Sequence, residues 1–131
     1  MFMKKSIKIG VLGAALVWSA SAYADGDPVH GEQVFKQCKV CHQIGPGAKP
    51  SVGPEQNGVY GSVAGTRPGF NYSAAMKQAG EKGIVWNDEN LNKYLENPKA
   101  IVPGTKMIFV GLKNEQDRLD VIAYLKANPA E

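Results

Sequence analysis

Five consecutive residues, Cys38-Lys39-Val40-Cys41-His42, constrain this chain more than any other segment. Two thiols three positions apart on a helical turn can reach the two vinyl groups of one porphyrin, and the next residue then directs its imidazole at the iron. The spacing is the attachment motif of a c-type haem. It predicts that Cys38 and Cys41 hold one haem c covalently and that His42 is an iron ligand.

Two other kinds of site use a pair of cysteines with this spacing. A redox-active dithiol of the thioredoxin type accompanies a βαβ pattern, which the sequence lacks. A structural zinc ion normally needs four ligands, and His30 is the one further histidine or cysteine in the chain. Both alternatives therefore account for the sequence less well than haem attachment does.

The first 24 residues have the pattern of a secretory signal peptide. Three lysines within the first eight residues precede the apolar segment Ile9–Trp18, and Ala22-Tyr23-Ala24 has the small-x-small form of a cleavage site. A transmembrane anchor would need about 20 apolar residues, and the apolar segment over residues 9–18 is too short for one. We therefore predict cleavage after Ala24, a single mature domain over residues 25–131, and export to the periplasm, where haem is attached.

The charge balance changes when the signal peptide is removed. The full chain has a formal net charge of +3, but the first 24 residues hold three lysines and no acidic residue, so the mature domain is near neutral. No basic stripe or nucleic-acid-binding motif is present, and we expect no nucleic-acid partner. Attraction to a protein partner must therefore depend on where the charges lie.

Helix-start and helix-stop signals divide the mature chain. Asp27 followed by Pro28 predicts a helix that leads to the cysteines, and residues 43–72 form a long loop rich in glycine and proline. A short helix is expected over residues 73–79, ending at Gly80. A long irregular segment is unusual in a small domain, but loops can pack on the apolar surface of a haem.

Two further helices are expected in the second half of the chain. Asn87 caps a helix that Asn97-Pro98 ends, with Leu91, Tyr94 and Leu95 buried. The last helix begins after Asn114 and buries Leu119, Ile122 and Leu125. No segment alternates apolar and polar residues long enough for a strand. We therefore predict an all-α fold of four to five helices, in which Gly31 lets the first helix approach Tyr124 on the last.

Three residues are candidates for the sixth iron ligand. Met107 lies in a Pro/Gly loop that can cover the far face of a haem, whereas Met76 occupies a helical position typical of core packing. His30 is expected on a helix surface. Loop context favours Met107 but leaves the alternatives open.

Four further motifs follow the haem motif in order along the mature chain. They are Trp86, Tyr94-Leu95-Glu96-Asn97-Pro98-Lys99, Pro103-Gly104-Thr105-Lys106-Met107-Ile108-Phe109 and Ile122-Ala123-Tyr124-Leu125-Lys126. With these motifs in this order, the chain closely resembles class I cytochromes c, and most of all the bacterial cytochrome c2 group, whose members are relatives of mitochondrial cytochrome c.

The resemblance implies a small cytochrome c fold wrapped round one haem, and it assigns roles to particular residues. Met107 would be the sixth ligand, and the Pro54 carbonyl would accept the imidazole N–H of His42. The remaining positions implied by the resemblance are Tyr72 and Trp86, which would hydrogen-bond a haem propionate, Tyr94 and Thr105, near the methionine sulfur and the propionates, and Phe109, beside the exposed haem edge.

Three positions depart from the family pattern. Ser62 stands where relatives often have an arginine near a propionate, Gln56 where a leucine is common, and Met76 where an asparagine is frequent. Loss of the arginine removes a positive charge beside a buried acid. We therefore expect a lower reduction potential or a shifted propionate pKa.

The resemblance implies a monomeric one-electron carrier rather than an enzyme. Its partners would be membrane redox complexes of the bc1, terminal oxidase or photosynthetic reaction centre type, and the sequence does not choose among them. A haem enzyme or gas sensor would need an open sixth site, and a dedicated dehydrogenase subunit would need a stable, apolar interface. A basic collar for acidic partners is expected from Lys39, Lys99, Lys106 and Lys113.

Overall fold

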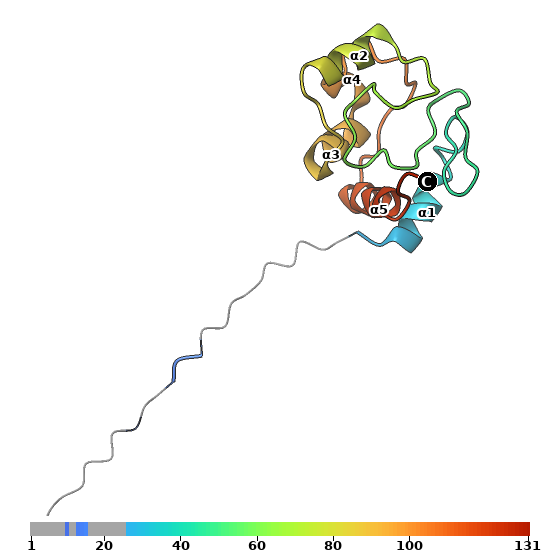
Figure 1. Ribbon diagram of the computed structural model, residues 1–131. Helices are drawn as coiled ribbons and strands as arrows, with labels where there is room; N and C mark the ends of the chain where they lie inside the picture. The colour runs from blue at the N-terminus through green and yellow to red at the C-terminus, as the bar shows by residue number, and fades with distance from the viewer. Residues whose placement is uncertain (1–9, 11–12, 16–25) are drawn as a thin grey trace, which may run out of the picture.

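Five helices surround a set of loops in the computed structural model, which describes residue 10, residues 13–15 and residues 26–131 (Figure 1). Within these residues the β-structure is limited to one isolated antiparallel bridge, between Val63 and Val85. The all-α prediction is therefore confirmed. The helices are α1 (Pro28–Phe35), α2 (Ala74–Glu81), α3 (Asp88–Glu96), α4 (Pro98–Ile101) and α5 (Glu115–Lys126).

Side-chain caps fix the start of four helices. The carboxylate of Asp27 accepts a hydrogen bond from the Val29 amide at 2.8 Å, and Asn87 accepts one from the Asn90 amide at 2.9 Å. Ser73 caps α2 and Asn114 caps α5 in the same way. Because a cap satisfies amides that have no partner within the helix, these four residues determine where the helices begin.

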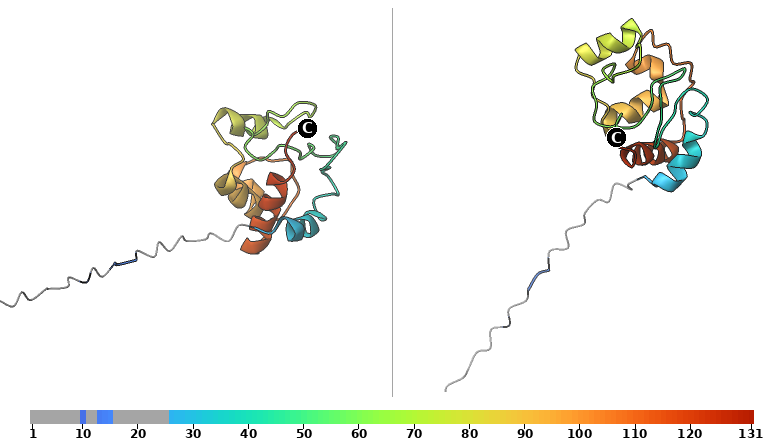
Figure 2. Two further views of the ribbon diagram at one scale, coloured as in Figure 1. Left: turned by 60° about the horizontal axis from the view of Figure 1, so that its bottom comes forward. Right: turned by 45° about the vertical axis from the view of Figure 1, so that its right-hand side comes forward.

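The first and last helices pack against each other, as predicted, and lie side by side in Figures 1 and 2. A β-carbon at Gly31 would lie 2.0 Å from the backbone oxygen of Asp120 and 2.9 Å from the β-carbon of Tyr124. Glycine is therefore required where the two backbones meet. The rings of Phe35 and Tyr124 extend the contact, with centroids 5.4 Å apart.

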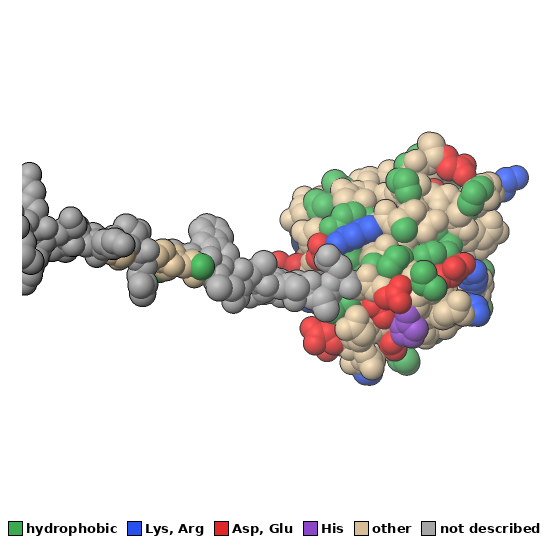
Figure 3. Space-filling model, turned by 90° about the horizontal axis from the view of Figure 1, so that it is seen from below, with side chains coloured by type: hydrophobic (Ala, Val, Ile, Leu, Met, Phe, Trp, Pro, Cys, Tyr) green, Lys and Arg blue, Asp and Glu red, His purple; other side chains and the backbone are tan. Residues whose placement is uncertain are grey.

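A buried carboxylate joins the two ends of the domain. Asp120, on α5, is 2% exposed and accepts hydrogen bonds from the Asp27 amide at 2.7 Å, from Gln116 at 2.8 Å and from Nδ1 of His30 at 2.6 Å. Burial raises the pKa of Asp120, but the three hydrogen bonds outweigh it and the pKa is lowered. On this face, seen in Figure 3, a histidine side chain lies among acidic side chains.

Three local predictions differ from the structure. Helix α2 continues past Gly80 to Glu81, because Gly80 serves a close approach instead: its β-carbon would lie 1.9 Å from the Ala64 oxygen. Asn97 and Pro98 end α3 as predicted but also begin the four-residue α4. On α5 Leu119 is half-buried, and Val121 joins Ile122 and Leu125 in the core instead.

A buried arginine ties α5 to the rest of the core. The guanidinium of Arg118, 6% exposed, donates to Asn92 on α3 at 2.8 Å and to the backbone oxygens of Leu112 and Lys113 at 2.8 and 3.2 Å. A buried N–H group of this guanidinium that had no acceptor would destabilise the folded state, because it would lose its hydrogen bonds to water. These bonds hold the segment that follows residue 107 against α3 and α5.

Among the described residues, no helix is long and apolar enough to cross a membrane. Most of the predicted signal peptide, residues 1–24, lies outside the part of the chain that the structure describes. That prediction stays a prediction.

Candidate haem site

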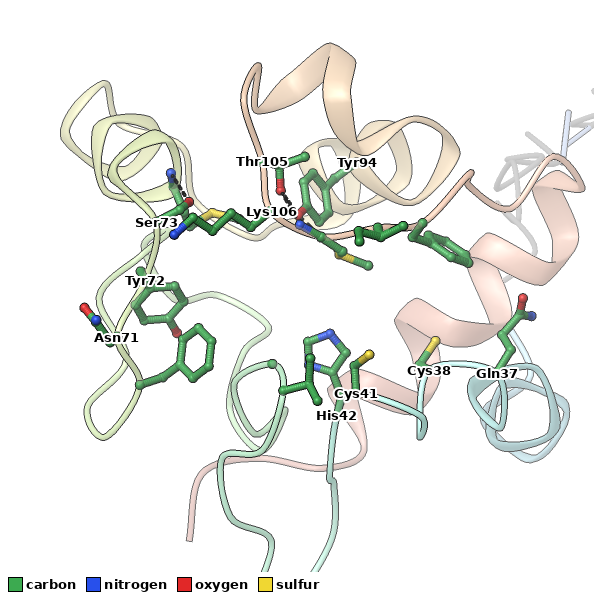
Figure 4. A pocket seen from close by; sticks show the side chains of 17 residues that line it. Gln37, Cys38, Cys41, His42, Asn71, Tyr72, Ser73, Tyr94, Thr105 and Lys106 are labelled. Carbon is green, nitrogen blue, oxygen red and sulfur yellow. Dashed lines mark hydrogen bonds between the residues drawn. The ribbon is translucent and has the colours of Figure 1, made fainter.

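A cavity of about 400 Å³ opens between the turn that carries the two cysteines and the loop that follows α4 (Figure 4). Loops provide most of its wall, and a second cavity of about 100 Å³ continues inward to the core side chains Trp86 and Leu91. The long loops therefore form the wall of a binding cavity for an apolar cofactor, because they line a space that the side chains of this small domain do not fill.

The three motif residues are brought to one side of this cavity. A turn closed by hydrogen bonds from the amides of Cys41 and His42 to the Cys38 oxygen, at 3.1 and 2.9 Å, presents both thiols and the imidazole together. The pKa of Cys38 is raised to about 11. Burial is the larger cause, and the charge of the neighbouring Cys41 thiolate is the smaller one. Before haem is attached, the free Cys38 thiol is therefore protonated and neutral at neutral pH.

The imidazole of His42 is fixed by its backbone neighbours. Its Nδ1 lies 2.7 Å from the Pro54 oxygen, which assigns the ring proton to Nδ1 and leaves Nε2 free to bind a metal. A β-carbon at Gly53 would lie 2.4 Å from Cε1 of the ring, so glycine is needed there. Burial lowers the pKa of His42, while the bond to Pro54 opposes that shift. A neutral imidazole is the form that ligates a metal.

Met107 lies on the opposite wall of the cavity, held by two neighbouring hydroxyls. The Tyr94 hydroxyl donates to the sulfur at 3.3 Å, and the Met107 amide donates to the Thr105 hydroxyl at 3.2 Å. The two hydroxyls lie 3.3 Å apart. Figure 4 shows Tyr94 and Thr105 across the cavity from His42 and Cys41. The structure thus places a thioether and an imidazole on facing walls.

Aromatic side chains close the inner end of the cavity. Trp86 is 6% exposed and packs on Tyr94, with ring centroids 4.8 Å apart, and Tyr72 points into the cavity (Figure 4). Burial raises the pKa of Tyr72, partly offset by Arg67, so its hydroxyl stays a donor at neutral pH. Ser62 bonds within its own loop, to the Val59 oxygen at 2.6 Å.

One contact was missed from the sequence. Gln56 was noted only as a departure in the pocket lining, but its side-chain nitrogen lies 3.1 Å from the Pro54 oxygen and 3.0 Å from Nδ1 of His42. A polar residue in an otherwise apolar pocket was the available signal. The hydrogen-bond partners of Gln56 could not be predicted from the sequence, because they depend on how the loop over residues 53–57 folds back on the cysteine turn.

The residues present fit a c-type haem. Two thiols at the attachment spacing, an imidazole with Nε2 available and a thioether opposite line the same largely apolar cavity. A family model, cytochrome c, matches residues 28–129. The chain belongs to the cytochrome c family. Its cofactor is therefore one haem c, bound covalently at Cys38 and Cys41, as predicted.

The relatives of this cytochrome include members of the cytochrome c2 group. Cytochrome c2 of Rhodomicrobium vannielii is 73% identical over 121 residues, covering 92% of this chain and 94% of that protein. Cytochrome c2 of Blastochloris viridis is 53% identical over 111 residues, covering 85% of each chain. These likenesses confirm the resemblance to class I bacterial cytochromes c2.

Solved structures of relatives agree with the fold. The structure of cytochrome c2 from Rhodospirillum centenum has a TM-score of 0.75 and 46% identity, and covers 80% of this chain and 100% of its own. Cytochrome cH from Methylobacterium extorquens has a TM-score of 0.71 and 41% identity, covering 78% and 99%. The small cytochrome c fold is confirmed, and the protein is an electron carrier rather than an enzyme.

Charged and apolar side chains surround the mouth of the cavity in this cytochrome. Lys106, Ile108 and Phe109 line it, and Ile108 is fully exposed. The other three lysines of the predicted collar are also exposed, and Lys113 donates to the Glu96 oxygen at 2.8 Å. The mouth of the cavity is therefore bordered by apolar side chains and by the positive charge of Lys106.

Proposed function

We propose that this cytochrome is a periplasmic one-electron carrier in which His42 and Met107 bind the iron. The observation that carries the proposal is the placement of the Met107 sulfur, held by Tyr94, across the cavity from the His42 ring. The haem supplies the chemistry, a change of one electron between Fe(II) and Fe(III). If His42 and Met107 both held the iron, electron transfer would need no substrate pocket and little rearrangement of the chain.

The residues around the ligands then have separable tasks. Pro54 holds the proton on Nδ1 of His42, which keeps the ring in one tautomer and raises its basicity. Tyr94 and Thr105 hold the loop that carries Met107 in its position against the cavity. Tyr72 and Trp86 offer an O–H and an N–H at the buried end, where haem propionates need donors.

Location and partners follow from the same proposal. Residues 1–24 would direct export and be removed after Ala24, and the cytochrome would act in the periplasm as a monomer. Its partners would be membrane redox complexes of the bc1, terminal oxidase or photosynthetic reaction centre type. Acidic surfaces on those complexes would meet the exposed lysines Lys39, Lys99, Lys106 and Lys113.

Visible spectra of the purified holoprotein test the ligation. We expect a low-spin spectrum, a methionine-to-iron charge-transfer band in the oxidised state and no response of the reduced state to carbon monoxide. Met107→Ala should remove the band and admit carbon monoxide, because the sixth position is then open. The matched control is Met76→Leu, since Met76 lines the same cavity and is the other candidate sulfur. Loss of the band in Met76→Leu but not in Met107→Ala would refute the assignment.

A further inference from the structure

Three polar atoms meet beside the proposed iron ligand, and the residues that carry them, His42, Pro54 and Gln56, also line the inner cavity. Nδ1 of His42 lies 2.7 Å from the Pro54 oxygen, the Gln56 side-chain nitrogen lies 3.1 Å from that same oxygen, and the two nitrogens are 3.0 Å apart. One carbonyl thus faces two donors. A carbonyl oxygen has two lone pairs, so it can accept from both, but each bond is then weaker than one made alone.

The orientation of the Gln56 amide follows from these distances. If the amide were turned round, its oxygen could accept from Nδ1–H of His42 at 3.0 Å, but it would also lie 3.1 Å from the Pro54 oxygen, where two acceptors would be in contact. With the nitrogen in that place, one N–H points at the carbonyl and the contact is favourable. The backbone N–H of Gln56 donates to the backbone oxygen of Gln43 at 2.9 Å, which fixes the backbone from which the side chain extends.

We propose that Gln56 is a positioning residue that competes with His42 for the Pro54 carbonyl and thereby raises the reduction potential. The inference rests on the proposed ligation of iron by His42. A strong hydrogen bond from Nδ1–H gives the ring anionic character and makes it a better ligand for Fe(III). Because Gln56 shares the acceptor, that bond is weaker, the ring donates less, and Fe(II) is favoured relative to Fe(III).

The test is the reduction potential of the Gln56→Leu holoprotein. We expect it to fall, so that the ratio of reduced to oxidised protein at a fixed ambient potential decreases by about threefold or more. Replacing an amide with an apolar side chain beside a haem would by itself disfavour the extra positive charge of Fe(III) and raise the potential. The sign of the change therefore separates the two effects. The matched control is Gln78→Leu, an exposed glutamine on α2, which should leave the potential unchanged.

A second variant keeps the test decisive if leucine impairs folding. Gln56→Met keeps most of the side-chain length but has no N–H to donate, and it should lower the potential as Gln56→Leu does. A potential that is unchanged or raised in either folded variant would overturn the inference. The paramagnetic NMR spectrum of the oxidised protein provides an independent readout, since the Nδ1–H resonance of the ligand imidazole should exchange more slowly in Gln56→Leu.

The same spectrum distinguishes the two levels of proposal. If His42 gives no hyperfine-shifted ring resonances, it is not an iron ligand, and the proposed function and this inference fail together. If His42 is the ligand and the Nδ1–H resonance and the potential stay at their wild-type values in Gln56→Leu, only the role of Gln56 is overturned.

Discussion

The hydroxyl of Tyr94 donates a hydrogen bond to the sulfur of Met107 at 3.3 Å. A donor on a thioether draws electron density from the sulfur and makes it a poorer ligand for Fe(III). Tyr94→Phe should therefore lower the reduction potential. The change should be at most about 60 mV, since a hydrogen bond contributes about 0.5–1.5 kcal/mol and 59 mV corresponds to tenfold for one electron.

Tyr60→Phe is the matched control for that prediction. Its hydroxyl donates to Asp88 at 3.0 Å on the surface, so the same atom is removed without a change near the sulfur. Protein-film voltammetry of both variants measures the effect. Equal potentials for Tyr94→Phe and Tyr60→Phe would show that the hydroxyl does not influence the proposed ligand.

The pair formed by His30 and Asp120 should make stability depend on pH. The hydrogen bond to Asp120 raises the pKa of His30 above its ordinary value of 6.5, against a smaller desolvation effect, and the charges of Asp120, Asp117 and Asp27 add to the rise. The folded state then binds the proton more tightly than the unfolded state does. This stabilisation is fully present below pH 6.5 and is lost as the pH rises through the folded-state pKa.

Urea unfolding of the holoprotein between about pH 6 and pH 8 measures that contribution. In His30→Gln the free energy of unfolding should fall less with rising pH than in the wild type. Asp120→Asn should flatten the dependence in the same way, because it removes the charge that raises the histidine pKa. A wild-type pH dependence in both variants would contradict the prediction.

Gly31→Ala should destabilise the packing of α1 on α5. Alanine favours a helix by about 1 kcal/mol over glycine. Here its β-carbon would lie 2.0 Å from the Asp120 oxygen, a backbone atom that cannot move without displacing α5. We expect a net loss of about 1–3 kcal/mol in the free energy of unfolding. Gln33→Ala, at an exposed position of the same helix, is the control and should change stability little.

Lys106 should influence the rate at which a partner accepts electrons. It is exposed and lines the mouth of the cavity, so Lys106→Glu should slow the reaction with an acidic partner and weaken its dependence on ionic strength. Stopped-flow rates at several salt concentrations measure both quantities. The control is Lys82→Glu, an exposed lysine at the end of α2 that lies outside the cavity lining. Equal slowing in both variants would indicate net charge rather than a docking site.

Much of the fold was predictable because the signals are local. Asp27, Asn87 and Asn114 cap the helices expected of them, since a cap depends on a few residues that follow it. The contact of Gly31 with α5 was also predicted, because a glycine on the first helix allows a close approach where the first and last helices cross. Local sequence thus determined where most helices begin.

Long-range contacts account for much of what was missed. Gly80 has the residue type of a helix stop, but it is a glycine because Ala64, from the long loop, approaches it. Asn97-Pro98 predicts the end of α3, but the pair also has the N-cap and proline pattern that begins a helix at Asp27-Pro28, and this second signal was missed. At the site, the motif residues were predictable from spacing, whereas the position of Gln56 depends on the path of a loop.

The α1 and α5 contact has a consequence for how the protein is made. The Asp27 amide bonds to a carboxylate 93 positions further along the chain, so the first helix has no packing partner until nearly the whole chain has been synthesised. Cys38 and Cys41 follow α1 directly and appear early. The two ends can therefore close on each other only after the whole segment between them, which includes Cys38 and Cys41, is present.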